Sequence, residues 1–262
     1  MLLHAVDATT LGITSIEIVS PNTDVFVLSL KPLPELCENS SFVTGRGHRR
    51  RKILLSPIVC ALGPDRTAVL PGFHAWSGAD VTESFADKGK LTCWNTFIEA
   101  DEDSVKALAD LGTASHPTSS TLAATEKLVC QLYQPRMHIS KVEDLRWLLF
   151  RKKQAQSERL TPTQASLKEA ILRAHYRTMT WNNDKVPNSG LPSPETYGWR
   201  IEKGILNYRF ISYRNKIADS LNILFKCQNL RDIEYCVYFF KGEWVLVIDP
   251  GRKRGLLIHW MM

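Results

Sequence analysis

Apolar residues recur every three to four positions over much of the chain, a spacing typical of helices that bury one face. The pattern is regular over residues 91–111, and the candidate core residues of this range are Trp94, Phe97, Val105 and Leu108. Further amphipathic helices are expected at 122–133, 142–151 and 165–181. The stretch from 91 to 181 is therefore predicted to be all-helical.

The chain before residue 91 mixes short apolar runs with helical periods. Residues 1–11 are expected to form a helix that ends at Gly12, and residues 16–19 a short buried strand. The range 25–30 is ambiguous. Its β-branched and aromatic residues favour a strand, while Asp24 before it would cap a helix well.

Glycine and proline positions divide the rest of this region. The apolar runs 42–43 and 53–55 flank an arginine-rich loop and are predicted to pair as a hairpin. Residues 57–62 and 66–76 are predicted to be helical, and Pro71 implies a kink or a break inside the second helix.

These elements place the chain in the α/β class, with an incomplete parallel sheet and helices, a mainly helical half and a β-rich tail. The predicted units are a core at 1–112, a helical extension at 113–181, a linker at 182–202 and an unassigned tail at 203–262. The linker is rich in proline and asparagine. In the tail, 235–240 and 244–248 are predicted to form a hairpin across Lys241 and Gly242.

Composition limits the classes of function. The six cysteines form no C-x-x-C pair, which argues against a zinc ribbon or a thioredoxin motif and fits thiols in a reducing compartment. No apolar run is long enough to span a bilayer, so we expect no membrane contact and an intracellular location, in the nucleus or the cytoplasm. The net charge of +6 favours contact with polyanions.

The positive charge is concentrated in two clusters. The first cluster consists of Arg46, Arg49, Arg50, Arg51 and Lys52. It predicts contact with DNA or RNA, although Gly45 and Gly47 also fit a solvated hairpin tip. The second cluster consists of Arg146, Arg151, Lys152 and Lys153. It fits either a nucleic-acid contact or the C-terminal end of a helix, where basic side chains oppose the dipole.

Two acidic residues follow apolar runs and are candidates for a metal site. Asp24 comes shortly after the run 16–19, and Asp80 comes after the run that ends at Trp76. Ligands bind at the rim of an open parallel sheet beyond the carboxyl ends of its strands, and two carboxylates there could hold Mg²⁺. Because Asp is also a common turn and N-cap residue, a structural role is the alternative.

Longer motifs around both acidic residues resemble one family. The motifs are Ser20-Pro21-Asn22-Thr23-Asp24-Val25, Leu70-Pro71-Gly72-Phe73-His74-Ala75-Trp76-Ser77-Gly78-Ala79-Asp80 and Lys88-Gly89-Lys90. Further matches lie at 147–153, 174–176 and 181–184. From residue 1 to about 200, the chain resembles a transposon-associated family of uncharacterised animal proteins. The core of that family is similar to the PIN-like, flap-endonuclease-type nuclease domain.

The resemblance implies a fold, a chemistry and a set of site residues. It implies a PIN-like parallel sheet at residues 1–112 and Mg²⁺-dependent cleavage of phosphodiesters. Asp24 and Asp80 would be the catalytic metal ligands, with Asn22 beside them. Lys88, Gly89 and Lys90 would lie at a helix start that meets the nucleic-acid backbone.

The chain departs from the family at three places. Asn22 stands where the family has Asp, and Asp87 stands where the family has the first Gly of Gly-Lys-Gly-Lys. The family also carries acidic residues and a half-domain before the stretch that matches residues 1–4. Because two-metal cleavage needs several ligands, these departures predict Mg²⁺ binding that is weak or lost.

We therefore expect a fragment of a degenerate nuclease-related module that binds nucleic acid without efficient catalysis. The first alternative is an active Mg²⁺-dependent, structure-specific nuclease, in which Glu17, Glu83 or Asp87 supplies the further carboxylates. The second alternative is a protein-interaction module without chemistry, whose protein partners are unknown. Four or more acidic groups around Asp24 and Asp80 would favour the enzyme.

Overall fold

The computed structural model describes most of the chain. The described residues are 2–31, 33–80, 82–152, 160–184, 186, 190–202, 205–208, 235–240 and 243–248. The chain divides into two compact units, Met1–Ile211 and Ser212–Met262, which are described separately below. None of the described helices is long and apolar enough to cross a membrane.

The first unit begins with a small mixed sheet and helices on it. The elements are α1 (Leu2–Thr10), β1 (Ser15–Val19), α2 (Thr23–Leu30), the 3₁₀ turn η1 (Leu33–Glu35), β2 (Asn39–Thr44), the 3₁₀ turn η2 (Gly47–Arg49) and β3 (Arg51–Leu54). The strand order is β1-β2-β3. The ambiguous range 25–30 is helical. The strand expected at 16–19 is present, but only Ile18 in it is fully buried.

The sheet is only partly parallel. β1 pairs in parallel with β2, and Ile18 lies opposite Phe42. β2 pairs antiparallel with β3, and Phe42 lies opposite Ile53. The predicted hairpin is therefore confirmed. It makes the sheet mixed rather than parallel throughout, because the short η2 connection can join only antiparallel neighbours.

Helix α3 (Leu55–Trp76) connects the sheet to the helical part of the chain and is interrupted at Gly63, whose φ is 75°. The break therefore falls between the predicted helices 57–62 and 66–76. The backbone stays helical at Pro71, where a kink or a break was expected. Pro64 follows Gly63 at the start of the second helical segment. Its missing N–H costs no hydrogen bond there, because the first N–H groups of a helix have no partner within the helix. Gly63 tolerates the left-handed φ that a break needs.

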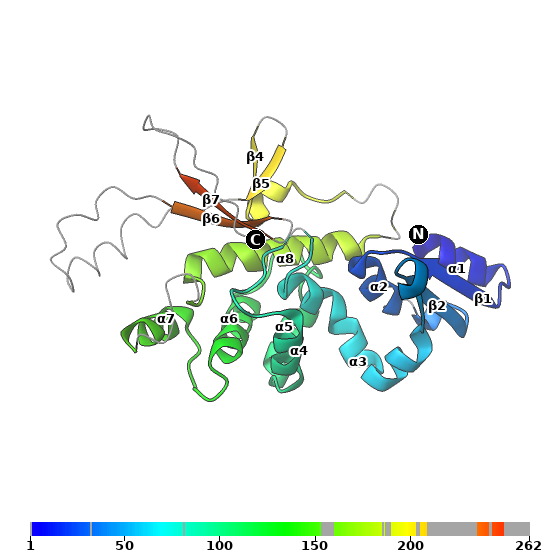
Figure 1. Cartoon of the computed structure of the whole chain (residues 1–262), viewed down its shortest axis with the longest axis horizontal. Helices are drawn as coiled ribbons and strands as arrows, with labels where there is room; N and C mark the ends of the chain where they lie inside the picture. Colours follow the sequence, from blue (N-terminus) through cyan, green and yellow to red (C-terminus); the bar gives the residue numbers. More distant parts are fainter. Residues whose placement is uncertain are drawn as a thin grey trace. The chain divides into compact units, whose positions relative to one another are not determined.

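The helical part contains α4 (Lys90–Ile98), α5 (Glu102–Ala109), α6 (Ser119–Tyr133), α7 (Val142–Arg151) and α8 (Gln164–Asn182). The helix expected over 91–111 is two helices. Asp101 caps the second of them, because its side chain accepts a hydrogen bond from the Ser104 N–H. The other three predicted helices are confirmed. Helix α8 packs against α3 and α6 (Figure 1).

One hydrophobic core joins the second half of α3 to the later helices. Its members include Phe73, Phe97, Leu128, Leu145 and Ile171. A smaller core holds residues of α1, β1, α2, β2 and α3. The helical layer thus crosses the boundary expected at 112–113.

The end of the first unit packs on α8. The 3₁₀ turn η4 (Pro194–Tyr197) and the strand β4 (Trp199–Glu202), which pairs with β5 (Ile205–Tyr208), bring Tyr197 and Trp199 against Met179. Part of the predicted linker 182–202 is therefore packed. In the second unit, β6 (Tyr235–Phe240) and β7 (Glu243–Ile248) pair antiparallel, which confirms the predicted hairpin. Lys241 and Gly242 lie outside the described residues.

Candidate functional site

The turn between β1 and α2 is built by its own polar side chains. Asn22 is the N-cap of α2, and its Oδ1 accepts a hydrogen bond of 2.6 Å from the Asp24 N–H. The Ser20 hydroxyl accepts a bond of 3.1 Å from the Asn22 N–H. Asn22 rather than Asp24 therefore caps the helix, and the Asp24 side chain is left for other partners.

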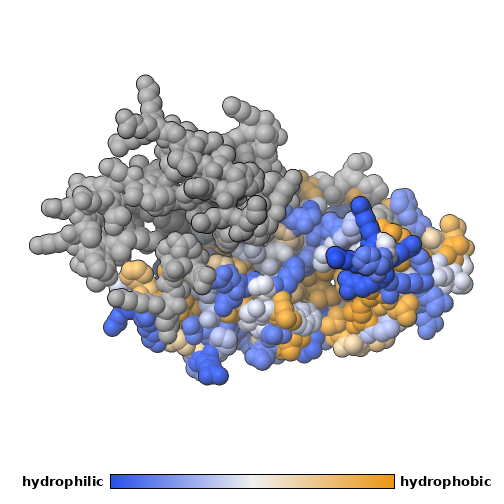
Figure 2. Space-filling view, viewed as in Figure 1, coloured by the Kyte–Doolittle hydropathy of each residue, from blue (hydrophilic) through white to orange (hydrophobic). Residues whose placement is uncertain are grey.

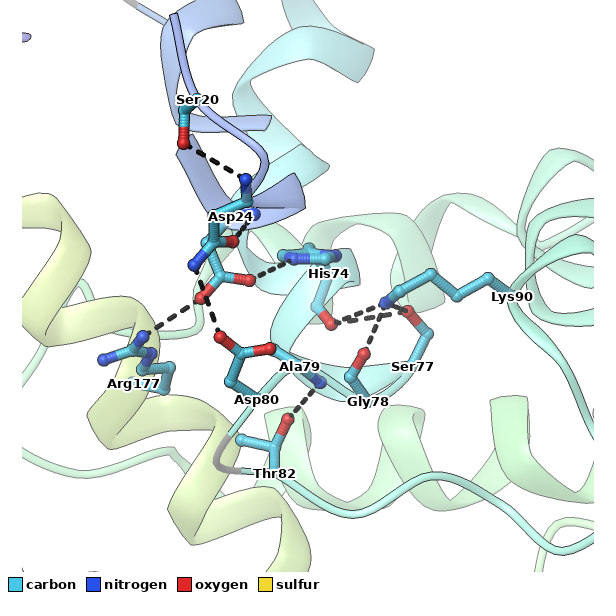
Figure 3. A network of polar contacts seen from close by, with 11 residues as sticks. Ser20, Asp24, His74, Ser77, Gly78, Ala79, Asp80, Thr82, Lys90 and Arg177 are labelled. Atoms are coloured by element: carbon cyan, nitrogen blue, oxygen red, sulfur yellow. Dashed lines mark hydrogen bonds and ion pairs between the residues drawn. The ribbon is translucent and has the colours of Figure 1, made fainter. Parts of the chain in front are cut away.

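Asp24 lies buried between two basic side chains from distant helices. His74 of α3 places Nε2 at 2.8 Å from Asp24 Oδ1, and Arg177 of α8 donates from Nη2 to Oδ2 over 3.0 Å (Figure 3). The exposed fraction of the Asp24 and His74 side chains is 7% and 5%. Each carboxylate oxygen thus has a nitrogen partner from the protein itself.

These contacts decide the charge of Asp24. Burial raises the pKa of the carboxyl, but the hydrogen bonds and charges of His74 and Arg177 outweigh burial, and the net effect lowers the pKa. The carboxylate is therefore ionised at neutral pH. An ionised carboxylate only accepts hydrogen bonds, so His74 is the donor, from Nε2.

Trp181 holds the two basic side chains in place. The His74 ring stacks on it with a centroid distance of 5.6 Å and an interplanar angle of 20°. The Arg177 guanidinium lies 4.8 Å from the centroid of the Trp181 ring. A cation over an indole face is favourable, and packing of this kind fixes the direction in which Arg177 reaches Asp24.

Asp80 joins the same group through Asn22. The Asn22 amide donates from Nδ2 to Asp80 Oδ2 over 3.3 Å. Asp80 is exposed, in the turn that follows α3. In that turn the Ala79 N–H donates to the Thr82 hydroxyl over 2.7 Å. The structure therefore brings Asn22, Asp24 and Asp80 together, as their motifs predict.

Lys90 is directed inward, toward the end of α3. Its ammonium donates to the carbonyl oxygens of His74 and Gly78 over 3.3 and 2.5 Å, and to the Ser77 hydroxyl over 3.1 Å (Figure 3). Burial lowers its pKa to about 8, although Asp24 opposes the change. Lys90 thus stabilises the turn that carries Asp80.

The neighbours of Lys90 have different surroundings. Gly89 is the N-cap of α4, and a Cβ added there would meet no atom within 4 Å. The Lys88 ammonium lies 5.0 Å from the centroid of the Tyr133 ring. Of the three residues expected to contact a phosphate, Lys90 has its ammonium directed to protein oxygens.

The carboxylates considered as further metal ligands have other contacts. Glu17 pairs with Lys52 at 2.5 Å. Glu83 accepts a bond of 2.9 Å from Arg173 Nε and forms a second contact with Arg173 Nη2. Asp87 takes a positive φ of 57° in the turn before α4. Among the described residues, no group of three or more His, Cys, Asp or Glu side chains is placed to hold a metal ion.

The first basic cluster lies at the tip of the β2–β3 hairpin. All five of its side chains belong to exposed residues, and Lys52 alone pairs with a carboxylate, that of Glu17. Among the described residues, no acidic group lies within ion-pair distance of Arg46, Arg49, Arg50 or Arg51. Figure 2 shows hydrophilic residues projecting at the end of the first unit that carries β1 and β2 in Figure 1. We call these four arginines the arginine tip.

Sequence reasoning missed the partners of Asp24. His74 stands inside a motif that was noted, but Arg177 is 153 positions from Asp24 and carries no motif of its own. The only available signal was the spacing of Arg177 and Trp181 by one helical turn.

Comparison of the chain with family models, with curated proteins and with solved structures finds no match.

Proposed function

We propose that this chain is a nucleic-acid-binding module related to PIN-like, flap-endonuclease-type nucleases, and that it does not cleave nucleic acid efficiently. The observation that supports binding is the arginine tip, which presents four exposed guanidinium groups, none of them within ion-pair distance of a carboxylate of the described residues. Phosphate contacts of Arg and Lys supply most of the sequence-independent affinity of proteins for DNA. Glu17 offsets part of the charge of this hairpin, because it pairs with Lys52 and also interacts electrostatically with Arg50.

The surroundings of Asp24 support the absence of efficient cleavage. A divalent ion would have to displace Arg177 or His74 from the carboxylate oxygens to bind there. Asn22 has an uncharged amide side chain, and its oxygen already accepts a hydrogen bond from the Asp24 N–H. Of Asp24 and Asp80, only Asp80 has a solvent-exposed carboxylate. Two-metal cleavage of a phosphodiester needs metal ions that are held by several ligands. These residues do not fit a resident Mg²⁺ pair.

The alternative of an active nuclease requires Asp24 to exchange its protein partners for metal. The carboxylates that were expected to help, Glu17 and Glu83, pair with Lys52 and Arg173 instead. No contact in the described chain favours this exchange, so we keep the binding module as the proposal.

Salt dependence of binding tests the role of the arginine tip. The variant Arg49→Gln, Arg50→Gln, Arg51→Gln should bind single-stranded and duplex DNA more weakly than the unmodified chain. Each lost phosphate contact lowers the slope of log K against log salt by about 0.7–0.9, so the slope should fall by about two to three. Fluorescence anisotropy at several salt concentrations measures this slope.

A second triple variant controls for net charge. Arg66, Lys106 and Lys168 are exposed basic residues on other helices. Their replacement by glutamine changes the net charge by the same amount and should leave the slope nearly unchanged. If both variants bind like the unmodified chain, the arginine tip is a solvated turn and the proposal is wrong.

A further inference from the structure

Two aromatic side chains lie exposed on α7. The helix buries Val142, Leu145 and Leu149, whereas Trp147 and Phe150 keep exposed fractions of 45% and 37%. Their ring centroids are 6.2 Å apart and their planes differ by 27°. Among the described residues, they are the only aromatic side chains in the set of exposed large apolar residues, and they contact each other. We call this pair the aromatic platform.

The charged side chains of α7 change sign along the helix, from acidic at its start to basic at its end. Glu143 and Asp144 lie in the first turn of the helix, and Arg151 and Lys152 lie at its end. Both basic residues are exposed. Among the described residues, neither lies within ion-pair distance of a carboxylate. An anionic ligand on the platform would be repelled at the first turn and attracted at the last.

The combination limits what the platform can bind. A partner with an aliphatic surface could bind to any exposed apolar side chain, aliphatic or aromatic. The other exposed apolar residues, such as Val19 and Leu54, are aliphatic, so what distinguishes the platform is its rings. Two stacked rings beside exposed basic groups match the chemistry of unpaired bases on a phosphate backbone. A duplex keeps its bases stacked inside and offers the rings nothing to stack on.

We propose that Trp147 and Phe150 form a base-stacking site for single-stranded nucleic acid, with the adjoining phosphates directed toward Arg151 and Lys152. The inference rests on the proposed nucleic-acid binding and adds a ligand class to it. The arginine tip would contribute affinity for any strand, and the platform would contribute the preference for unpaired bases.

The test compares aromatic with aliphatic side chains at the same positions in the full chain. In Trp147→Leu, Phe150→Leu the surface stays apolar but loses its rings, and exposure of both residues predicts a folded protein with unchanged thermal unfolding. Stacking is worth about 1–3 kcal/mol per base, so affinity for a fluorescent oligothymidine should fall at least about fivefold. Affinity for a duplex of the same length should stay the same.

The possible outcomes distinguish failure of the aromatic platform from failure of the proposed nucleic-acid binding. A loss confined to the single strand supports the aromatic platform. Equal affinity of the variant and the unmodified chain for the single strand overturns the platform, and the proposed function stands if the arginine-tip variant still loses binding. An unmodified chain that binds neither the oligothymidine nor the duplex overturns both proposals.

Discussion

Asp24→Asn is expected to lower the free energy of unfolding by about 3 kcal/mol, because it leaves one acceptor for two basic donors in a buried site. Removing one member of a buried, hydrogen-bonded ion pair leaves the other charge without compensation. Urea unfolding followed by circular dichroism measures the change. If Asp24 belonged to a cluster of mutually repelling carboxylates, the same substitution would stabilise the protein instead.

The matched control is Asp80→Asn. Asp80 is exposed and accepts one long hydrogen bond from Asn22, so this variant should lie within about 0.5 kcal/mol of the unmodified chain. Equal effects of the two substitutions would contradict the structural role that we give to Asp24.

The effect of Asp24→Asn should also depend on pH. The folded state lowers the pKa of Asp24 below its ordinary value of 3.8, so the unfolded chain takes up the proton first as the pH falls. The contribution of Asp24 is complete above that value and is lost below it. The difference in stability between the unmodified chain and the variant should therefore narrow in acid.

Gly72→Ala is expected to cost about 3 kcal/mol or more, although alanine is usually the better helix residue by about 1 kcal/mol. A Cβ at Gly72 would lie 2.0 Å from the carbonyl oxygen of Leu108, which is a backbone atom. Helices α3 and α5 would have to move apart, and the core around Phe73 and Leu111 would loosen. Chemical unfolding measures this change as well.

Gly190→Ala is the control for this second substitution. A Cβ at Gly190 would meet no atom within 4 Å. Its effect should stay within about 0.5 kcal/mol. A Gly72→Ala chain as stable as the unmodified one would mean that α3 and α5 do not approach as closely as the structure has them.

The same contact explains part of the motif that led to the resemblance. The segment from Leu70 to Trp76 is buried throughout, in the second half of α3. Gly72 is small where α5 approaches, and His74 reaches Asp24. The motif therefore has a structural reason that does not depend on catalysis.

Local patterns were enough to predict several elements. The helices α6, α7 and α8 and the β2–β3 hairpin follow from periodicity and turn residues. The break in α3 at Gly63 lies between the two helices predicted at 57–62 and 66–76, whereas Pro71 stays inside the second helical segment. A proline within a helix does not by itself place the break.

The site was predictable in position but not in chemistry. The motifs predict that Asn22, Asp24 and Asp80 meet, and Asn22 hydrogen-bonds to both acidic residues. The charge state of the group depends on Arg177, which reaches Asp24 from α8 only after the tertiary fold has formed. The inward direction of Lys90 has the same origin, since sequence cannot tell which oxygens surround an ammonium group.

Binding of nucleic acid without cleavage is the function that we propose for the chain. The most direct measurement incubates the full chain with end-labelled flap, single-stranded and duplex DNA, with Mg²⁺ and with a chelator. Binding and product are then read from the same samples. We predict retarded, salt-sensitive complexes and intact DNA in both conditions. Cleavage that requires Mg²⁺ and disappears in Asp80→Ala would contradict the account and establish the nuclease.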